Sequence, residues 1–132
     1  MTDTICDILH ALGITANYKG FHYAALAVEL VTMDQSMLLL VTKELYPQVA
    51  SCFSTTASRV ERNIRHTVDL AWRTNPRLLQ ELAGYPLLRR PCASQFIAIL
   101  AEFCKKEVTT LEPDGQLRLG FSSAPDPYGP FW

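Results

Sequence analysis

The feature that most constrains the fold is the amphipathic stretch STTASRVERNIRHTVDLAWR, which runs from Ser54 to Arg73. On a helix at about 100° per residue, its apolar side chains share one stripe, formed by Val60, Ile64, Val68, Ala71 and Trp72. The cations lie roughly opposite this stripe, at Arg59, Arg62, His66 and Arg73, with Arg65 on a flank. A helix that buries one side and exposes cations on the other predicts a polyanionic partner, and DNA is the leading candidate.

The remaining segments predict an all-α fold, a compact bundle of about six helices. Helical spacing or a leucine-rich run marks helices at 2–12, 21–33, 37–45, 46–53, 76–83 and 94–106. Asn17 and Gly20 suit a turn before the second helix. The segment 37–45 has few polar breaks, which predicts a well-buried helix. Ser94 is the predicted N-cap of the last helix.

The C-terminal segment has a different composition. Pro113-Asp114-Gly115 separates VTTL from QLRLGF, which predicts a small β-hairpin, and the prolines that follow predict an extended tail. We therefore expect a helical DNA-binding domain at 1–106 and a hairpin with a proline-rich tail at 107–132.

The charge distribution supports a DNA-binding surface, although the formal net charge is only −1. Residues 1–42 contain Lys19 as their one Lys or Arg, against four Asp and Glu. Residues 43–106 contain ten Lys and Arg against five Asp and Glu, and residues 107–132 are again acidic. The middle of the chain is therefore locally basic, as the surface of a DNA-binding protein is.

Other patterns exclude several classes of protein. No apolar run reaches the roughly 18 residues that a membrane span needs, and the N-terminus lacks a basic leader, which predicts a cytoplasmic protein that joins the nucleoid when bound to DNA. The four cysteines form no CxxC pair and are expected to be mostly buried thiols. Cys6 and His10 could form only half a metal site, so no metal or cofactor is expected. Without GxSxG, HExxH or a phosphate-binding glycine loop, an enzyme is not predicted.

The stretch from Tyr46 to Arg73 has the parts of a helix-turn-helix, a short helix, a tight turn and a longer helix. Ala50 is small where the two helices must approach, and Val60 and Ile64 point into the angle between them. Ser54 occupies the turn position that is often glycine. This pattern predicts that the second helix lies in a major groove of DNA.

The residue types on this helix match the chemistry of DNA. Arginine can donate two hydrogen bonds to guanine O6 and N7, and a glutamate can accept one from cytosine N4. Arg59, Glu61 and Arg62 lie in the first turns and are predicted to read bases. The predicted contacts to the DNA backbone are Thr55, Thr56, Ser58, Arg65 and His66. The alternative is a solvated charged face with a Glu61–Arg65 pair.

Beyond this chemistry, the stretches LGITANYKGFHYA, TKELYPQVASCFSTTASRVERNIRHTVDLAW and GYPLLRRPCASQFIAIL resemble the C-terminal DNA-binding effector domain of the sporulation master response regulator of endospore-forming Firmicutes. The resemblance covers residues from about Ile5 to about Glu102. It implies an all-helical transcription regulator that binds double-stranded DNA at a TGTCGAA box, contacts the sigma subunit of RNA polymerase, and forms a homodimer on tandem sites.

The resemblance also carries over residue by residue. The base-reading positions of the family fall on Arg59, Glu61 and Arg62, and its backbone positions on Ser58, Arg65 and His66. Ser94 is likewise expected at the DNA backbone. The loop between Gly84 and Ser94 departs from the family pattern, because it is shorter and contains Arg89-Arg90.

A second expectation concerns regulation. The family joins this domain to an N-terminal phosphoacceptor receiver, and no receiver precedes Met1 in this sequence. Control by amount, by a partner or by the tail is then expected. The alternative function is a receiver-less interaction protein that binds the sigma subunit or the full-length regulator and modulates it.

Overall fold

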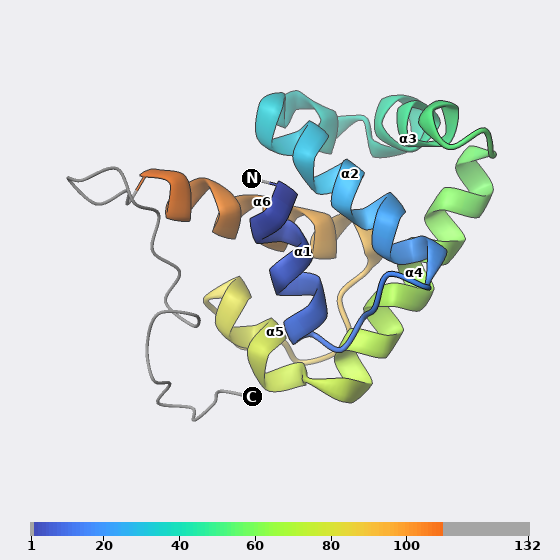
Figure 1. The fold of residues 1–132 in the computed structure, drawn as a ribbon. Helices are drawn as coiled ribbons and strands as arrows, with labels where there is room; N and C mark the ends of the chain where they lie inside the picture. Colours follow the sequence, from blue (N-terminus) through green and yellow to red (C-terminus); the bar gives the residue numbers. More distant parts are fainter. Residues whose placement is uncertain (1, 110–132) are drawn as a thin grey trace.

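The protein is a bundle of α-helices in the part of the chain that the computed structural model describes, which is residues 2–109, with side chains for 4–106 (Figure 1). The elements are α1 (Thr2–Ala11), α2 (Lys19–Met33), the 3-10 helix η1 (Gln35–Leu39), the π-helix η2 (Val41–Leu45), α3 (Tyr46–Cys52), α4 (Ala57–Thr74), α5 (Pro76–Ala83) and α6 (Ala93–Thr109). No strand occurs within residues 2–109. The predicted all-α class is therefore confirmed.

The predicted boundary region at the end of α6 needs one correction. Val108 and Thr109, which were expected to begin a hairpin strand, are the last residues of α6. The remainder of the predicted hairpin and tail, from residue 110 onward, lies outside the described residues.

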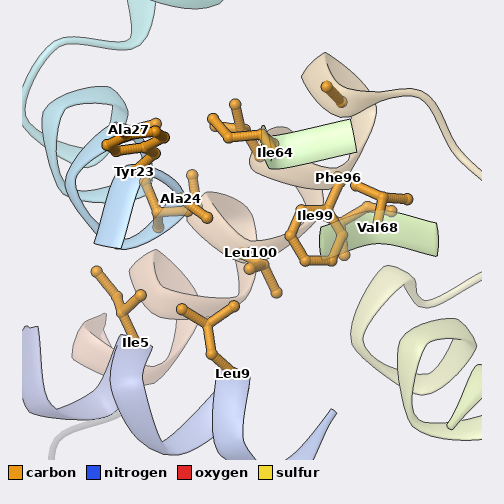
Figure 2. Close-up of a cluster of buried hydrophobic side chains, with 14 of the residues drawn as sticks. Ile5, Leu9, Tyr23, Ala24, Ala27, Ile64, Val68, Phe96, Ile99 and Leu100 are labelled. Carbon is orange, nitrogen blue, oxygen red and sulfur yellow. The ribbon is translucent and has the colours of Figure 1, made fainter. Parts of the chain in front are cut away.

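The core forms where α2, α4 and α6 pack together, with α1 across them. Figure 2 shows apolar side chains from these four helices converging on one cluster, among them Ile5, Leu9, Tyr23, Ala24, Ala27, Ile64, Val68, Phe96, Ile99 and Leu100. Phe96 and Ile64 are completely buried. Burial of a side chain of this size contributes about 1.5–3 kcal/mol, so the cluster holds α4 firmly against the bundle.

Gly20 is not the turn residue that the sequence suggested, because it is the second residue of α2 and is buried. A Cβ atom added at Gly20 would overlap Thr67 Oγ1 and the backbone carbonyl oxygen of Asn63, both on α4. The missing side chain therefore lets the first turn of α2 approach the middle of α4. This approach places Lys19 beside α4.

The prediction of one well-buried helix at 37–45 is wrong. The segment is divided into η1 and η2 at Leu40, whose backbone leaves the helical region at φ −130° and ψ 45°. Only Met37 and Leu45 are buried, while Leu39 is 85% exposed. Asp34 begins η1, because its carboxylate accepts hydrogen bonds from the backbone N–H of Ser36 at 3.1 Å and from its hydroxyl at 2.6 Å. Leucine composition predicted burial along the whole segment, but only its two end residues, Met37 and Leu45, are buried in the core.

The cysteines differ from expectation as well. Cys104 is buried and Cys6 is half-buried, but Cys52 and Cys92 are exposed, so the prediction of mostly buried thiols is wrong. Within the described residues, none of the helices combines the length and apolar character that crossing a membrane requires.

The close approach at Gly20 can be tested by whether Gly20→Ala raises or lowers the free energy of unfolding. Glycine inside a helix costs about 0.5–1 kcal/mol relative to alanine, so helix propensity alone would make Gly20→Ala stabilising. Because the new methyl group would overlap α4, we expect Gly20→Ala to lower the free energy of unfolding instead, by about 1–3 kcal/mol in urea denaturation. Combined with Thr67→Ala, the loss should be smaller than the sum of the single losses. A higher unfolding free energy for Gly20→Ala would contradict the close packing.

Candidate nucleic-acid interface

The turn between α3 and α4 fixes how α4 leaves the bundle. Pro47 lies in the first turn of α3, where its fixed φ suits a helix start. After α3, Ser54 has a left-handed backbone with φ +54°, and the N–H of Thr55 donates to the carbonyl of Ala50 at 3.0 Å. Ser54 therefore occupies a position that favours glycine, as the sequence indicated.

Thr56 begins α4 as its N-cap. Its hydroxyl oxygen accepts a hydrogen bond from the backbone N–H of Arg59 at 3.2 Å. A cap of this kind satisfies one of the N–H groups that a helix start leaves without a partner, and it contributes about 1 kcal/mol. Thr56 thus has a structural role in addition to the predicted contact with DNA.

The buried face of α4 matches the predicted apolar stripe, with two differences. The buried residues are Val60, Ile64, Thr67, Val68 and Ala71, whereas Trp72 is only half-buried. Thr67 was missed because it is polar, although its spacing from Ile64 and Ala71 is helical. Its hydroxyl donates to the carbonyl of Asn63 at 3.0 Å, which satisfies it against α2.

The opposite face of α4 is exposed and cationic. Its exposed residues include Ser58, Arg59, Arg62, Arg65, His66 and Arg73. Within residues 4–106, Arg59 and Arg62 have no ion-pair partner. Their guanidinium groups are therefore available to an external acceptor.

Glu61 and Arg65 form the expected i, i+4 pair, with Oε1 and Nη2 3.4 Å apart. The side chains are 36% and 50% exposed. A surface pair of this kind contributes about 0.2–1 kcal/mol, so a stronger partner for either group can separate it.

The three predicted base-reading residues do not lie on one line. At about 100° per residue, Arg59 and Glu61 point about 160° apart, and Arg62 lies between them on the outward side. Arg62 shares the outward side with Ser58. Arg59 belongs to the flank that faces α2, since it lines a hollow with Lys19 and Thr55. Glu61 belongs to the opposite flank.

Tyr46 shows which elements meet on the Glu61 flank. Burial raises the pKa of its phenol to about 12, and the Glu61 carboxylate adds to this effect. Cys92 also raises the pKa and Arg65 lowers it, so all three lie within electrostatic range of the Tyr46 side chain. The start of α3, the first half of α4 and the start of α6 therefore meet here, and Tyr46 stays neutral at physiological pH.

Ser94 is not the N-cap of α6. The helix begins at Ala93, and the carbonyl of Cys92 accepts the hydrogen bond from Phe96 N at 2.9 Å, so Cys92 occupies the cap position. Ser94 Oγ lies 3.3 Å from Cys92 Sγ, a hydrogen bond that lowers the pKa of that thiol. Ser94 is half-buried and lines a hollow with residues 38–43. The prediction that Ser94 caps α6 is therefore wrong, and the contact of Ser94 with DNA stays a prediction.

Asp69 and Arg90 form a contact that the sequence did not predict. Arg90 Nη1 donates to Asp69 Oδ1 at 2.5 Å, which ties the loop between α5 and α6 to the exposed side of α4. This hydrogen bond holds the pKa of the Asp69 carboxyl below its ordinary value. The basic pair Arg89-Arg90 was visible in the sequence, but its partner twenty-one residues earlier was not.

Metal ligation has little support in the described region. No group of three or more His, Cys, Asp or Glu is arranged there to hold an ion. The His10 ring, which the sequence offered as half of a site with Cys6, packs against Phe21 with 5.0 Å between ring centroids.

The chain was compared with models of known protein families. The model of the family described as "Sporulation initiation factor Spo0A C terminal" matches residues 5–103. The match includes α2, α3, α4 and α5 completely and most of α1 and α6. The family that the sequence resembled is thereby confirmed, and the chain belongs to the sporulation initiation factor Spo0A C-terminal family.

Proposed function

We propose that this protein is a sequence-specific, double-stranded DNA-binding transcription regulator of the sporulation-initiation type. In this proposal α3 and α4 form a helix-turn-helix, and α4 enters the major groove. The observation that supports it most is the exposed face of α4, where Arg59 and Arg62 have no ion-pair partner within residues 4–106. The apolar face of α4 is buried, so only the cationic face can meet DNA.

The proposed contacts follow from the geometry of α4. Arg62, at the centre of the outward face, and Arg59, on its α2 flank, donate to guanine O6 and N7. Glu61 accepts from cytosine N4 once a phosphate draws Arg65 away from it. The hydroxyls and cations at the edge of this surface bind phosphates and set the register of the helix, namely Thr55, Thr56, Ser58, Arg65, His66 and Ser94.

Membership of the family supports two further partners. We propose that the protein forms a homodimer on tandem TGTCGAA boxes and contacts the sigma subunit of RNA polymerase. Both events take place on DNA, so the protein is associated with the nucleoid when it is active.

A second function, from a different class, is favoured by one surface. Met33 at the end of α2, Leu39 at the end of η1 and Leu40 directly after it are 75%, 85% and 43% exposed. Neighbouring exposed apolar side chains are typical of protein–protein contacts. The interaction function predicts capture of the sigma subunit or of the full-length regulator, together with no shift of a box-containing duplex at low salt.

Replacing Arg62 with alanine tests base reading. We expect Arg62→Ala to cost about 1–3 kcal/mol on the TGTCGAA duplex and to relax discrimination at one base pair, because a bidentate contact is lost. Fluorescence anisotropy with the box duplex, its single-base variants and a scrambled duplex measures this. Arg77→Ala is the matched control, since Arg77 is an exposed arginine on α5. Equal discrimination by both variants would sink the base-reading role of Arg62.

Replacing Asp69 tests the charge of this surface, because the change is expected to tighten DNA binding. Asp69→Asn removes a negative charge from the exposed side of α4 and releases Arg90. We expect tighter binding to box and scrambled duplexes alike, and a salt dependence steeper by about 0.9 in the slope of log K against log salt, because Arg90 becomes free to bind a phosphate. Glu81→Gln, which removes the Arg77–Glu81 ion pair on α5, is the control. The same change in slope for both variants would show a general charge effect instead.

A further inference from the structure

The two flanks of α4 differ in how their charges are compensated. On the flank toward α3 and α6, the Glu61–Arg65 and Asp69–Arg90 pairs place a carboxylate next to each arginine. On the flank toward α2, Arg59 and Arg73 form no ion pair within the described residues. The surplus positive charge of this face is therefore concentrated on the α2 side.

A hollow of about 220 Å³ lies on that side, between the start of α2 and the second half of α4. Lys19 and Arg73 are the cations that line it, and its polar lining includes Tyr18, Asn63 and His66. No Asp or Glu lines it. Arg73 Nε donates a hydrogen bond to the backbone carbonyl of Asp69 at 3.4 Å. The Asp69 carboxylate lies within electrostatic range of Arg73, but its ion pair is with Arg90.

A second hollow, of about 310 Å³, continues the first toward the start of α4. Lys19 lines both, and the second hollow adds His22, Thr55 and Arg59, again without a carboxylate. Lys19 thus lies at the junction of a surface, hereafter the α2 flank, that follows the length of α4. The start of α2 lies beside α4 in Figure 1, as the contact at Gly20 requires.

The position of Lys19 is not explained by stability. It is exposed, and it has no ion-pair partner within the described residues. It is also the one Lys or Arg in residues 1–42, which are otherwise acidic. An exposed ammonium in an acidic segment, held beside a row of arginines by a glycine that admits no side chain, raises local repulsion unless an anion joins it.

We propose that the α2 flank binds consecutive backbone phosphates of one DNA strand, with Lys19 and Arg73 as the contacting cations. The inference rests on the proposed DNA-binding function. It adds that the α2 flank contacts the phosphates of one of the two strands that border the groove. Phosphates along one strand are regularly spaced, which suits cations distributed along a helix that lies in the groove. On the opposite flank the Glu61–Arg65 and Asp69–Arg90 ion pairs must separate before their arginines can bind phosphates.

Salt dependence of binding tests the proposal. We expect Lys19→Gln to reduce the slope of log K against log salt by about 0.9, because one phosphate contact is lost. Affinity should fall by the same factor on the TGTCGAA duplex and on a scrambled duplex, since a phosphate contact reads no sequence. Arg73→Gln should have the same two effects.

Lys106→Gln is the matched control, because it removes one positive charge near the end of α6, where it lines a hollow with residues of α5. That end of α6 lies across the molecule from α4 (Figure 1). Its slope should equal that of the unchanged protein. Thermal unfolding of all three variants checks that the fold is retained, which the exposure of Lys19 and Arg73 leads us to expect.

The outcomes separate this inference from the function on which it rests. Slopes for Lys19→Gln and Arg73→Gln that equal the slope of Lys106→Gln, with the preference for the box retained, overturn the phosphate contact alone. A reduced slope for Lys19→Gln, with no preference for the box in the unchanged protein, supports the phosphate contact and overturns base reading. Absence of binding to either duplex at low salt overturns both.

Discussion

The packing of α4 against α2 and α6 is the constraint on which the surface of this protein depends. Val60, Ile64 and Val68 are completely buried, and each lies a helical turn from the next, so the rotation of α4 about its axis is fixed. Once that rotation is fixed, Arg62 must point outward and Arg59 and Glu61 must lie on opposite flanks. The cationic face thus follows from the apolar one, because a helix cannot turn one side inward without turning the other outward.

The same packing brings distant parts of the chain to α4. Gly20 allows α2 to approach so closely that Lys19 joins the cations of α4. From the other side, the loop before α6 contributes Arg90, which neutralises Asp69 on the exposed side of α4. One neighbour therefore adds positive charge and the other offsets a negative charge. Both changes make the surface of α4 more favourable to a polyanion than its own sequence would.

Local chemistry and packing act together at the start of α4. Thr56 caps the helix and Ser54 accepts a left-handed backbone, so the chain reverses within a few residues after α3. Val49 and Ala50 of α3 are buried on the other side of this turn, so the turn joins two helices that both pack into the core. The position of this turn matters for the proposed base reading, since the predicted base-reading residues begin at Arg59.

The sequence by itself determined the all-α class, most of the buried stripe of α4, the turn position at Ser54 and the Glu61–Arg65 pair, although it missed Thr67 and included Trp72 in the stripe. All of these depend on residues within about two helical turns of one another, where spacing along the chain equals spacing in space. Only the tertiary structure decided that Gly20 serves a helix contact, that Leu39 is exposed, that Cys92 precedes α6 in the cap position, and that Lys19 and Arg90 reach α4. These depend on which surfaces meet, and periodicity contains no information about partners that are far away in the sequence.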